Sequence, residues 1–306
     1  MVVRLHEARL AIPAGDAIGE APVWDEAGQR LLWVDHLKGV IHEATGNSGR
    51  GWHERRRWSL NRPVAAAIPR IAGGLIVASG REILILTEEG TVRPFASLDV
   101  NPSVIRINEA KCDADGHLWV GTLSLEFRPD ATLYRITPEG SVTRVLEGVS
   151  LANGFDWSPD HSTFYFIDSL RMSVDEFDFD VARGSLSDRR LRIAIEAGAG
   201  APNGLTVDRE GSLWVALTGG AEVRRFSARG ELTDRVGISV PGATSCAFGG
   251  ADCTDLFITS RSGRMPEIAL SLGVRPEMME SSDPEAGALF VCQPPAQGKP
   301  AHRFAG

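Results

Sequence analysis

The chain has 306 residues, a formal net charge of −8 at pH 7 and 43% hydrophobic residues. The acidic balance and the lack of any long basic run argue against a nucleic-acid partner. The amino terminus lacks the continuous apolar stretch of a secretion signal, and eighteen apolar residues nowhere run together. We therefore expect a cytoplasmic protein without a membrane span.

The composition favours a protein made of strands and tight turns. The chain holds 33 glycines and 17 prolines, and its apolar runs are short and evenly spaced. Although 306 residues are enough for two ordinary domains, this pattern favours one large all-β domain over residues 1–306. The four cysteines form no C-x-x-C pair, so we expect buried free thiols.

Six segments repeat one pattern, in which a turn rich in Asp or Gly precedes three apolar residues. We call them the anchor segments, and their middle residues are Trp33, Ile76, Trp119, Tyr165, Trp214 and Phe257. A period of about 40–50 residues is the length of a four-stranded propeller blade. The sequence therefore predicts a six-bladed β-propeller, with each anchor segment as the innermost strand of its blade.

Two further segments bear on the fold. Residues 3–12 form a strand pattern, and we expect this strand to pair with carboxyl-terminal strands, because a closed ring leaves no unpaired sheet edge between blades. Residues 267–279, with prolines at positions 266 and 276, are the best candidate for a short helical insert.

Polar residues precede four of the six anchor segments at nearly equal offsets. Glu20, Asn108, Asn153 and Asn203 lie 13, 11, 12 and 11 residues before the middle of the next anchor segment. Equal offsets place these side chains at equal depth in the central channel. Each phrase alone is compatible with a simple turn, in which Asn-Gly uses the backbone freedom of glycine. Together, one carboxylate and several amide oxygens are typical of a site for a hard divalent cation.

The combined motifs resemble the SMP-30/gluconolactonase (regucalcin-like) family over most of the chain, from about residue 15 to about residue 290. The matching phrases are Gly19-Glu-Ala-Pro-Val-Trp24, Arg106-Ile-Asn-Glu-Ala-Lys111, Asn153-Gly154, Phe166-Ile-Asp-Ser169, Pro202-Asn-Gly204 and Ser245-Cys-Ala-Phe-Gly-Gly250. The resemblance implies a six-bladed propeller that hydrolyses the ester bond of a sugar lactone. It also implies one catalytic divalent cation, with calcium expected first and manganese, magnesium, zinc or iron(II) as alternatives.

The resemblance also assigns roles to single residues. Glu20, Asn153 and Asn203 match metal ligands, Arg106 and Asn108 match substrate contacts, and Glu109 matches an acidic neighbour that orients substrate hydroxyls. The family usually has Asp at position 203, as a ligand and as the base for water. Asn203 keeps an oxygen for the metal but loses a charge and a proton acceptor, so cation affinity should fall.

The general base is therefore open at this point. Glu109, Asp168 and Glu126 are alternative acids, with Glu126 also placed to contact substrate, and the sequence does not rank them. Asp168 is equally compatible with a hydrogen-bonding role at a strand end. His36 follows the first anchor segment and is open to two interpretations, a substrate contact or a residue of the rim.

The sequence predicts a divalent-metal-dependent hydrolase that opens small sugar-acid lactones. One alternative is a propeller that binds a cation or small ligand without turnover, and another is a Lewis-acid enzyme with a different substrate. Both alternatives rest on Asn203. We expect a small-molecule lactone as the partner, neither nucleic acid nor membrane, and a monomer or weak homo-oligomer.

Overall fold

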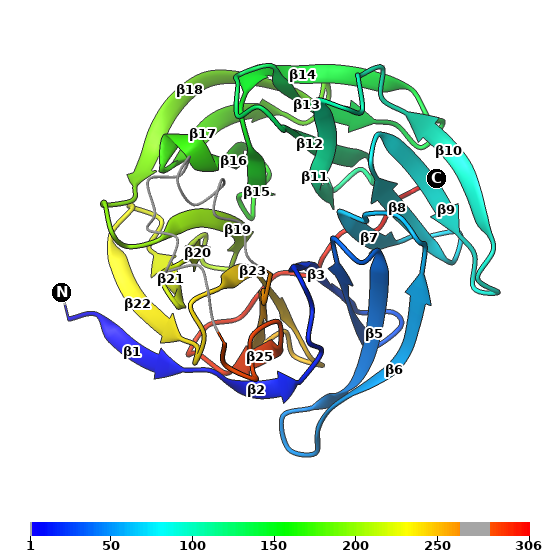
Figure 1. The fold of residues 1–306 in the computed structure, drawn as a ribbon. Coiled ribbons are helices and arrows are strands. Elements are labelled where there is room, and N and C mark those ends of the chain that lie inside the picture. Colours follow the sequence, from blue (N-terminus) through cyan, green and yellow to red (C-terminus); the bar gives the residue numbers. More distant parts are fainter. Residues whose placement is uncertain (1, 264–281) are drawn as a thin grey trace.

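The computed structural model describes residues 2–263 and 282–306, and these form six antiparallel sheets arranged around a central axis (Figure 1). Blade one contains β3 (Gly19–Asp25), β4 (Arg30–Asp35), β5 (Val40–Asn47) and β6 (Gly51–Ser59). Blade two contains β7 (Ala66–Pro69), β8 (Leu75–Ser79), β9 (Glu82–Leu86) and β10 (Val92–Ser97). Blade three contains β11 (Ile105–Cys112), β12 (Leu118–Ser124), β13 (Ala131–Ile136) and β14 (Val142–Val149).

The second half of the chain continues the same arrangement. Blade four contains β15 (Ala152–Trp157), β16 (Thr163–Asp168), β17 (Ser173–Asp180) and β18 (Ser185–Ala194). Blade five contains β19 (Ala201–Val207), β20 (Leu213–Thr218), β21 (Glu222–Phe226), β22 (Leu232–Gly237) and, as a fifth strand, β1 (Arg4–Glu7). Blade six contains β23 (Ala243–Gly249), β24 (Asp255–Ser260), β25 (Leu289–Cys292) and β2 (Arg9–Ile12). The six-bladed β-propeller predicted from the repeat is confirmed.

The amino-terminal segment joins two blades. Strand β2 pairs antiparallel with β25, so the predicted pairing with a carboxyl-terminal strand is confirmed for residues 9–12. Strand β1 instead pairs parallel with β22 and extends blade five. One continuous segment therefore completes blade six and connects it to blade five, and this closes the ring.

The anchor segments form the second strand of each blade, and the prediction that they are innermost is wrong. The inner strands are β3, β7, β11, β15, β19 and β23 (Figure 1). The second strands read as continuous apolar runs because they are buried on both faces between neighbouring blades. The Asp of the preceding turn is tied to the anchor, since Trp119 Nε1 donates to Asp113 at 2.7 Å and Trp214 Nε1 donates to Asp208 at 3.0 Å.

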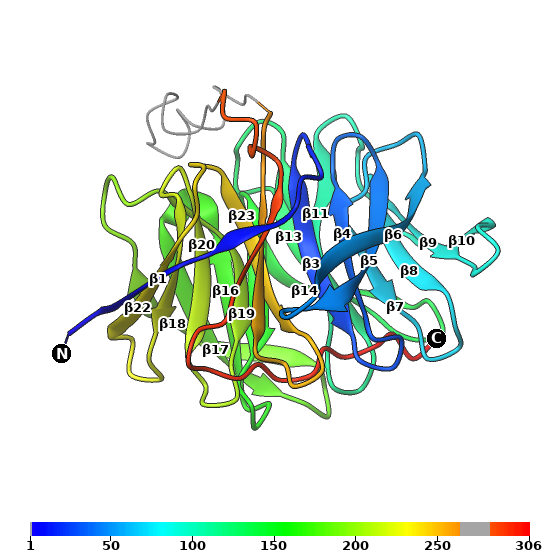
Figure 2. The same cartoon turned by 90° about the horizontal axis from the view of Figure 1, so that it is seen from below.

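The carboxyl-terminal segment crosses one end of the channel (Figure 2). Phe304 N donates to Pro69 O at 2.9 Å, and Ala305 N donates to Gly116 O at 3.0 Å, so the segment is tied to blade two and to the turn before β12 of blade three. The Phe304 side chain is fully buried and packs edge-on against Phe95. The channel is therefore covered at this end.

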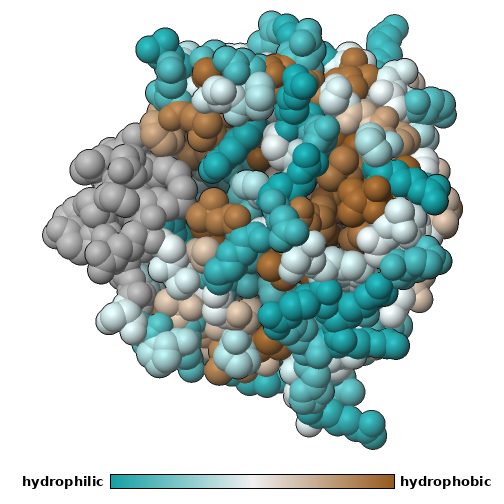
Figure 3. Space-filling model, turned by 45° about the vertical axis from the view of Figure 1, so that its right-hand side comes forward, coloured by the Kyte–Doolittle hydropathy of each residue, from teal (hydrophilic) through white to brown (hydrophobic). Residues whose placement is uncertain are grey.

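Other expectations can be compared with the structure. All four cysteines are buried and free, as predicted. The candidate helical insert at residues 267–279 lies outside the described residues. In the described part of the chain no helix is long and apolar enough to cross a membrane. On the face drawn in Figure 3, apolar patches are interrupted by polar side chains.

Candidate functional site at the channel

Five of the six inner strands carry a register shift, and at four of these shifts the sequence predicts a site residue. The shifts lie between Glu20 and Val23, Ile107 and Glu109, Ala152 and Phe155, Pro202 and Leu205, and Ala243 and Ser245. Such a bulge breaks the strict alternation of a strand and redirects a side chain. Glu20, Asn108, Asn153, Asn203 and Thr244, which lie at these shifts, all line one cavity.

Blade two is the exception. Strand β7 pairs with β8 in regular register, and its four residues are all buried. It contributes no residue to this cavity. This agrees with the sequence, in which no polar phrase precedes the second anchor segment.

The glycines after Asn153 and Asn203 serve close packing, which corrects the expectation of a glycine turn. Neither Gly154 nor Gly204 has a positive φ. A Cβ on Gly154 would lie 2.2 Å from Leu205 N, and a Cβ on Gly204 would lie 2.1 Å from Ser245 Oγ. Both contacts are with the inner strand of the next blade, so each glycine lets neighbouring inner strands approach at the axis.

The cavity lies where the inner strands begin. Its lining residues are Ile18, Glu20, His36, Arg106, Asn108, Leu123, Leu151, Asn153, Ser169, Ala201, Pro202, Asn203, Thr218, Thr244 and Arg261. We call it the site cavity. Its predicted members, Glu20, Arg106, Asn108, Asn153 and Asn203, come from four different blades and are brought together here.

The Asn203 amide is held in one orientation. Its Nδ2 donates to Thr218 Oγ1 at 3.0 Å and lies 3.4 Å from Glu20 Oε1. The Thr218 hydroxyl donates its own hydrogen to Ala243 O at 2.7 Å, so it can only accept from Asn203. The Asn203 Oδ1 is buried and has no hydrogen-bond donor among the described residues. A buried acceptor without a donor, next to a carboxylate, fits a cation ligand.

Asn153 is also held by its neighbours. Its Nδ2 donates to Ser169 Oγ at 2.6 Å, and the Ser169 hydroxyl donates to Pro202 O at 2.6 Å. Asn153 Oδ1 accepts from Asn108 Nδ2 at 2.9 Å and keeps a second lone pair. Asn108 also donates to Ala152 O at 2.7 Å. Both Asn108 donors are therefore committed to blade four, while Glu20, Asn153 and Asn203 form a set of one carboxylate and two amide oxygens that fits a hard divalent cation.

Glu20 and His36, two of the titratable groups of the site cavity, have strongly shifted pKa values. Burial, and next the charge of Glu109, raise the pKa of Glu20 from 4.5 to about 8. Burial, and next the charge of Arg106, lower the pKa of His36 to about 4. The His36 side chain is 4% exposed and makes no hydrogen bond to another described residue. Without a cation Glu20 therefore keeps its proton at pH 7, and a bound cation would displace this proton. His36 is a neutral imidazole at the same pH.

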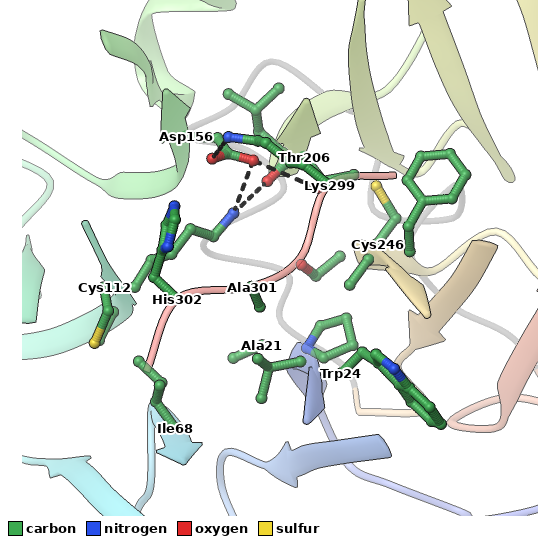
Figure 4. A pocket seen from close by; sticks show the side chains of 18 of the residues that line it. Ala21, Trp24, Ile68, Cys112, Asp156, Thr206, Cys246, Lys299, Ala301 and His302 are labelled. Atoms are coloured by element: carbon green, nitrogen blue, oxygen red, sulfur yellow. Dashed lines mark hydrogen bonds and ion pairs between the residues drawn. The ribbon is translucent and has the colours of Figure 1, made fainter. Parts of the chain in front are cut away.

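Glu109 lies in a second cavity, beyond the site cavity along the channel. This cavity is bounded by the carboxyl-terminal segment, and Lys299 Nζ donates to Asp156 Oδ1 at 2.7 Å within it (Figure 4). Burial raises the pKa of Glu109 to about 7. Because Glu109 acts on Glu20 through its charge, it affects the site without lining the site cavity.

The two remaining acids lie elsewhere. Asp168 is buried, and its carboxylate oxygens accept from Ser150 N and Leu151 N, each at 3.0 Å. Glu126 is exposed and pairs with Arg128 at 3.2 Å. Neither lines the site cavity. Asp168 therefore occupies the strand-end role that the sequence left open, and the structure does not bring Glu126 together with the predicted ligands.

Sequence reasoning missed several polar residues of the site cavity. Ser169, Thr218 and Arg261 each follow or end the second strand of a blade, and Thr244 lies at the bulge of β23. For the first three, the polar residue at the end of an anchor segment could have indicated a site residue. They were not predicted from the sequence because the anchor segments, and not the preceding strands, were expected to line the channel.

The site geometry can now be compared with known proteins. A model of the SMP-30/Gluconolactonase/LRE-like region matches residues 18–262. The chain belongs to this family. It is 36% identical to regucalcin of Danio rerio over 282 residues, which cover 89% of each chain.

Two solved structures are also similar. A luciferin-regenerating enzyme superposes with a TM-score of 0.85 at 27% identity and covers 98% of this chain and 100% of its own. A calcium-binding protein, regucalcin, from Agrobacterium tumefaciens gives a TM-score of 0.86 at 23% identity with full coverage of both chains, which shows the shared fold. The chain is thus a lactonase-like propeller of the SMP-30/gluconolactonase/LRE-like family.

The raised pKa of Glu20 predicts a pH-dependent stability of the metal-free protein. Between pH 4.5 and 8 the folded protein keeps a proton on Glu20 that the unfolded chain has lost, so the contribution of Glu20 to stability should fall as pH rises through this range. Below pH 6.5 the lowered pKa of His36 acts in the opposite direction, so the fall is expected to be clearest between pH 6.5 and 8. In Glu20→Gln this slope should be reduced. It should not vanish, because Glu109 also has a raised pKa. Thermal unfolding midpoints of metal-stripped protein from pH 5 to 8.5 measure the slope, and parallel profiles for the two proteins would contradict the assignment.

Proposed function

We propose that this protein is a divalent-metal-dependent hydrolase that opens small sugar-acid lactones. The observation that carries the proposal is the buried Asn203 Oδ1. This atom has no donor in the part of the chain that the structure describes, and it lies in the same cavity as the Glu20 carboxylate and the Asn153 amide oxygen. The family description supports lactone chemistry. The regucalcin of Agrobacterium tumefaciens is described as calcium-binding, which supports calcium as the first ion to test.

Glu20, Asn153 and Asn203 would hold the cation. When bound there, a divalent cation would polarise the lactone carbonyl and lower the pKa of a water molecule. With one carboxylate among three ligands, the site keeps a formal surplus of positive charge. This surplus weakens cation binding but strengthens the effect on a polarised carbonyl.

Other residues of the site cavity would bind and orient the substrate. Arg106 has a buried Nε without a partner, and its five N–H groups can donate to lactone oxygens. Asn108 has both of its donors in use, so its remaining oxygen is the atom that can accept from a substrate hydroxyl. His36, as a neutral imidazole facing the cavity, can accept a hydrogen bond from the attacking water.

The location, the oligomeric state and the partners of the protein are also part of this proposal. We propose a cytoplasmic protein that acts as a monomer or weak homo-oligomer on a small lactone. It would have no nucleic-acid or membrane partner, in keeping with the net charge of −8.

The direct test is proton release during lactone opening. Metal-stripped protein is reconstituted separately with calcium, manganese, magnesium, zinc and iron(II), and a panel of aldonolactones and simple lactones is supplied. We expect metal-dependent turnover that falls at least about 100-fold in Glu20→Gln, because loss of the cation removes several kcal/mol of transition-state stabilisation. Glu147→Gln, an exposed change on the outer strand β14, is the matched control and should keep full activity. Flat traces for every lactone, with cation binding still visible by calorimetry, would contradict the hydrolase and favour a ligand-binding propeller.

Asn203→Asp separates the hydrolase from the two alternatives. The new carboxylate would lie beside Glu20, so we expect cation affinity to rise at least about tenfold and the stability of the metal-free protein to fall through like-charge repulsion. Calorimetry and thermal unfolding measure these two effects. Lactone turnover should rise if Asn203 limits a lactonase. A loss of turnover despite tighter cation binding would show that the site uses Asn203 for a different reaction.

A further inference from the structure

The site cavity has more positive than negative charge. Its titratable lining residues are Glu20, His36, Arg106 and Arg261, and His36 is neutral at pH 7. Two guanidinium groups therefore face one carboxylate, and a bound divalent cation would add two further positive charges. Glu109 does not remove this excess, because the second cavity already has two lysines, Lys111 and Lys299, for its two acids, Glu109 and Asp156.

Neither arginine of the site cavity is used in an ion pair with a described residue. Arg106 has a buried Nε without a partner, and burial lowers its pKa. Arg261 is 5% exposed, and burial lowers its pKa too, against the charge of Glu20. Burying a guanidinium without a counter-ion costs free energy, because the group loses its hydration and gains no ion pair in return. Two of them in one cavity point to an anionic ligand.

Arg261 is held in place for such a contact. Its Nε and Nη2 donate to Gly263 O at 3.2 and 2.6 Å, and its backbone bridges Ile18 at the start of blade one. These contacts leave Nη1 without a partner among the described residues. Because the side chain is already fixed, binding an anion to Nη1 costs little side-chain entropy.

The position of Arg261 relative to the proposed cation ligands suggests how a substrate lies. Arg261 follows β24 of blade six, between blade one with Glu20 and blade five with Asn203. Arg106 is on blade three, on the opposite side of the ring (Figure 1). A small molecule that spans the channel can therefore contact both arginines.

We propose that the lactone opened by this protein carries an ionised carboxylate besides its ring ester, and that Arg261 binds this carboxylate. The substrate class is then the monolactone of a sugar diacid rather than a neutral aldonolactone. The substrate carboxylate would supply the counter-ion that the Arg261 guanidinium lacks among the described residues. This inference rests on the proposed lactonase function.

The test compares two lactones of the same ring size, one with a carboxylate and one with a hydroxymethyl group in its place. We expect kcat/KM to favour the carboxylated lactone at least tenfold, as for a charge-assisted hydrogen bond. Arg261→Gln should remove at least about tenfold of this preference, with a much smaller change for the neutral lactone. Arg261→Lys should restore part of it, and Arg144→Gln on the exposed outer strand β14 is the matched control.

A binding measurement separates this inference from the lactonase proposal. Calorimetry on metal-stripped protein compares the open-chain sugar diacid with the open-chain aldonic acid, and we expect tighter binding of the diacid that is lost in Arg261→Gln. If no lactone is opened but this preference is present, the hydrolase is contradicted and anion recognition by Arg261 stands. Equal turnover of both lactones, equal binding of both acids, or preference for a phosphorylated lactone would overturn the inference.

Discussion

The close approach of neighbouring inner strands around the axis is the constraint on which the rest of the structure depends. At Gly154 and Gly204 a single added Cβ would lie within 2.2 Å of the next blade. At this spacing the inner strands surround a narrow channel, and their bulges direct Asn153 and Asn203 into it. In each Asn-Gly pair the asparagine therefore supplies a side-chain oxygen to the channel, and the glycine allows the neighbouring inner strands to pack closely.

The same constraint explains why the site is assembled from distant parts of the chain. Glu20 and Asn203 are 183 residues apart, yet Asn203 Nδ2 lies 3.4 Å from the Glu20 carboxylate. The arrangement depends on ring closure, in which β1 pairs with blade five and β2 pairs with blade six. The site thus depends on the whole ring, and no single blade contains it.

The repeat and the ligand set could be predicted from the sequence because both recur at a regular period. Six anchor segments identify six blades, and equal offsets identify Glu20, Asn108, Asn153 and Asn203 as one group. Which strand lines the channel could not be predicted, since inner strands such as β7 and β15 are as completely buried as second strands such as β12. Because the anchor segments were expected to be innermost, the sequence did not predict Arg261, Thr218 and Ser169 as site residues. These three lie at the carboxyl-terminal ends of the second strands. The place of Glu109 was also hidden, because a bulge at Asn108 changes which cavity the next residue faces.

The central claim is that Glu20, Asn153 and Asn203 hold one divalent cation at the axis. Its most direct test is a crystal structure of the protein soaked in manganese, with the ion located by its anomalous scattering. The account predicts a single strong peak in the site cavity, within roughly 2.0–2.6 Å of the Glu20 carboxylate and of both amide oxygens. A site cavity without a peak at saturating manganese, or a peak bound by other residues with Asn203 Oδ1 turned away, would contradict it.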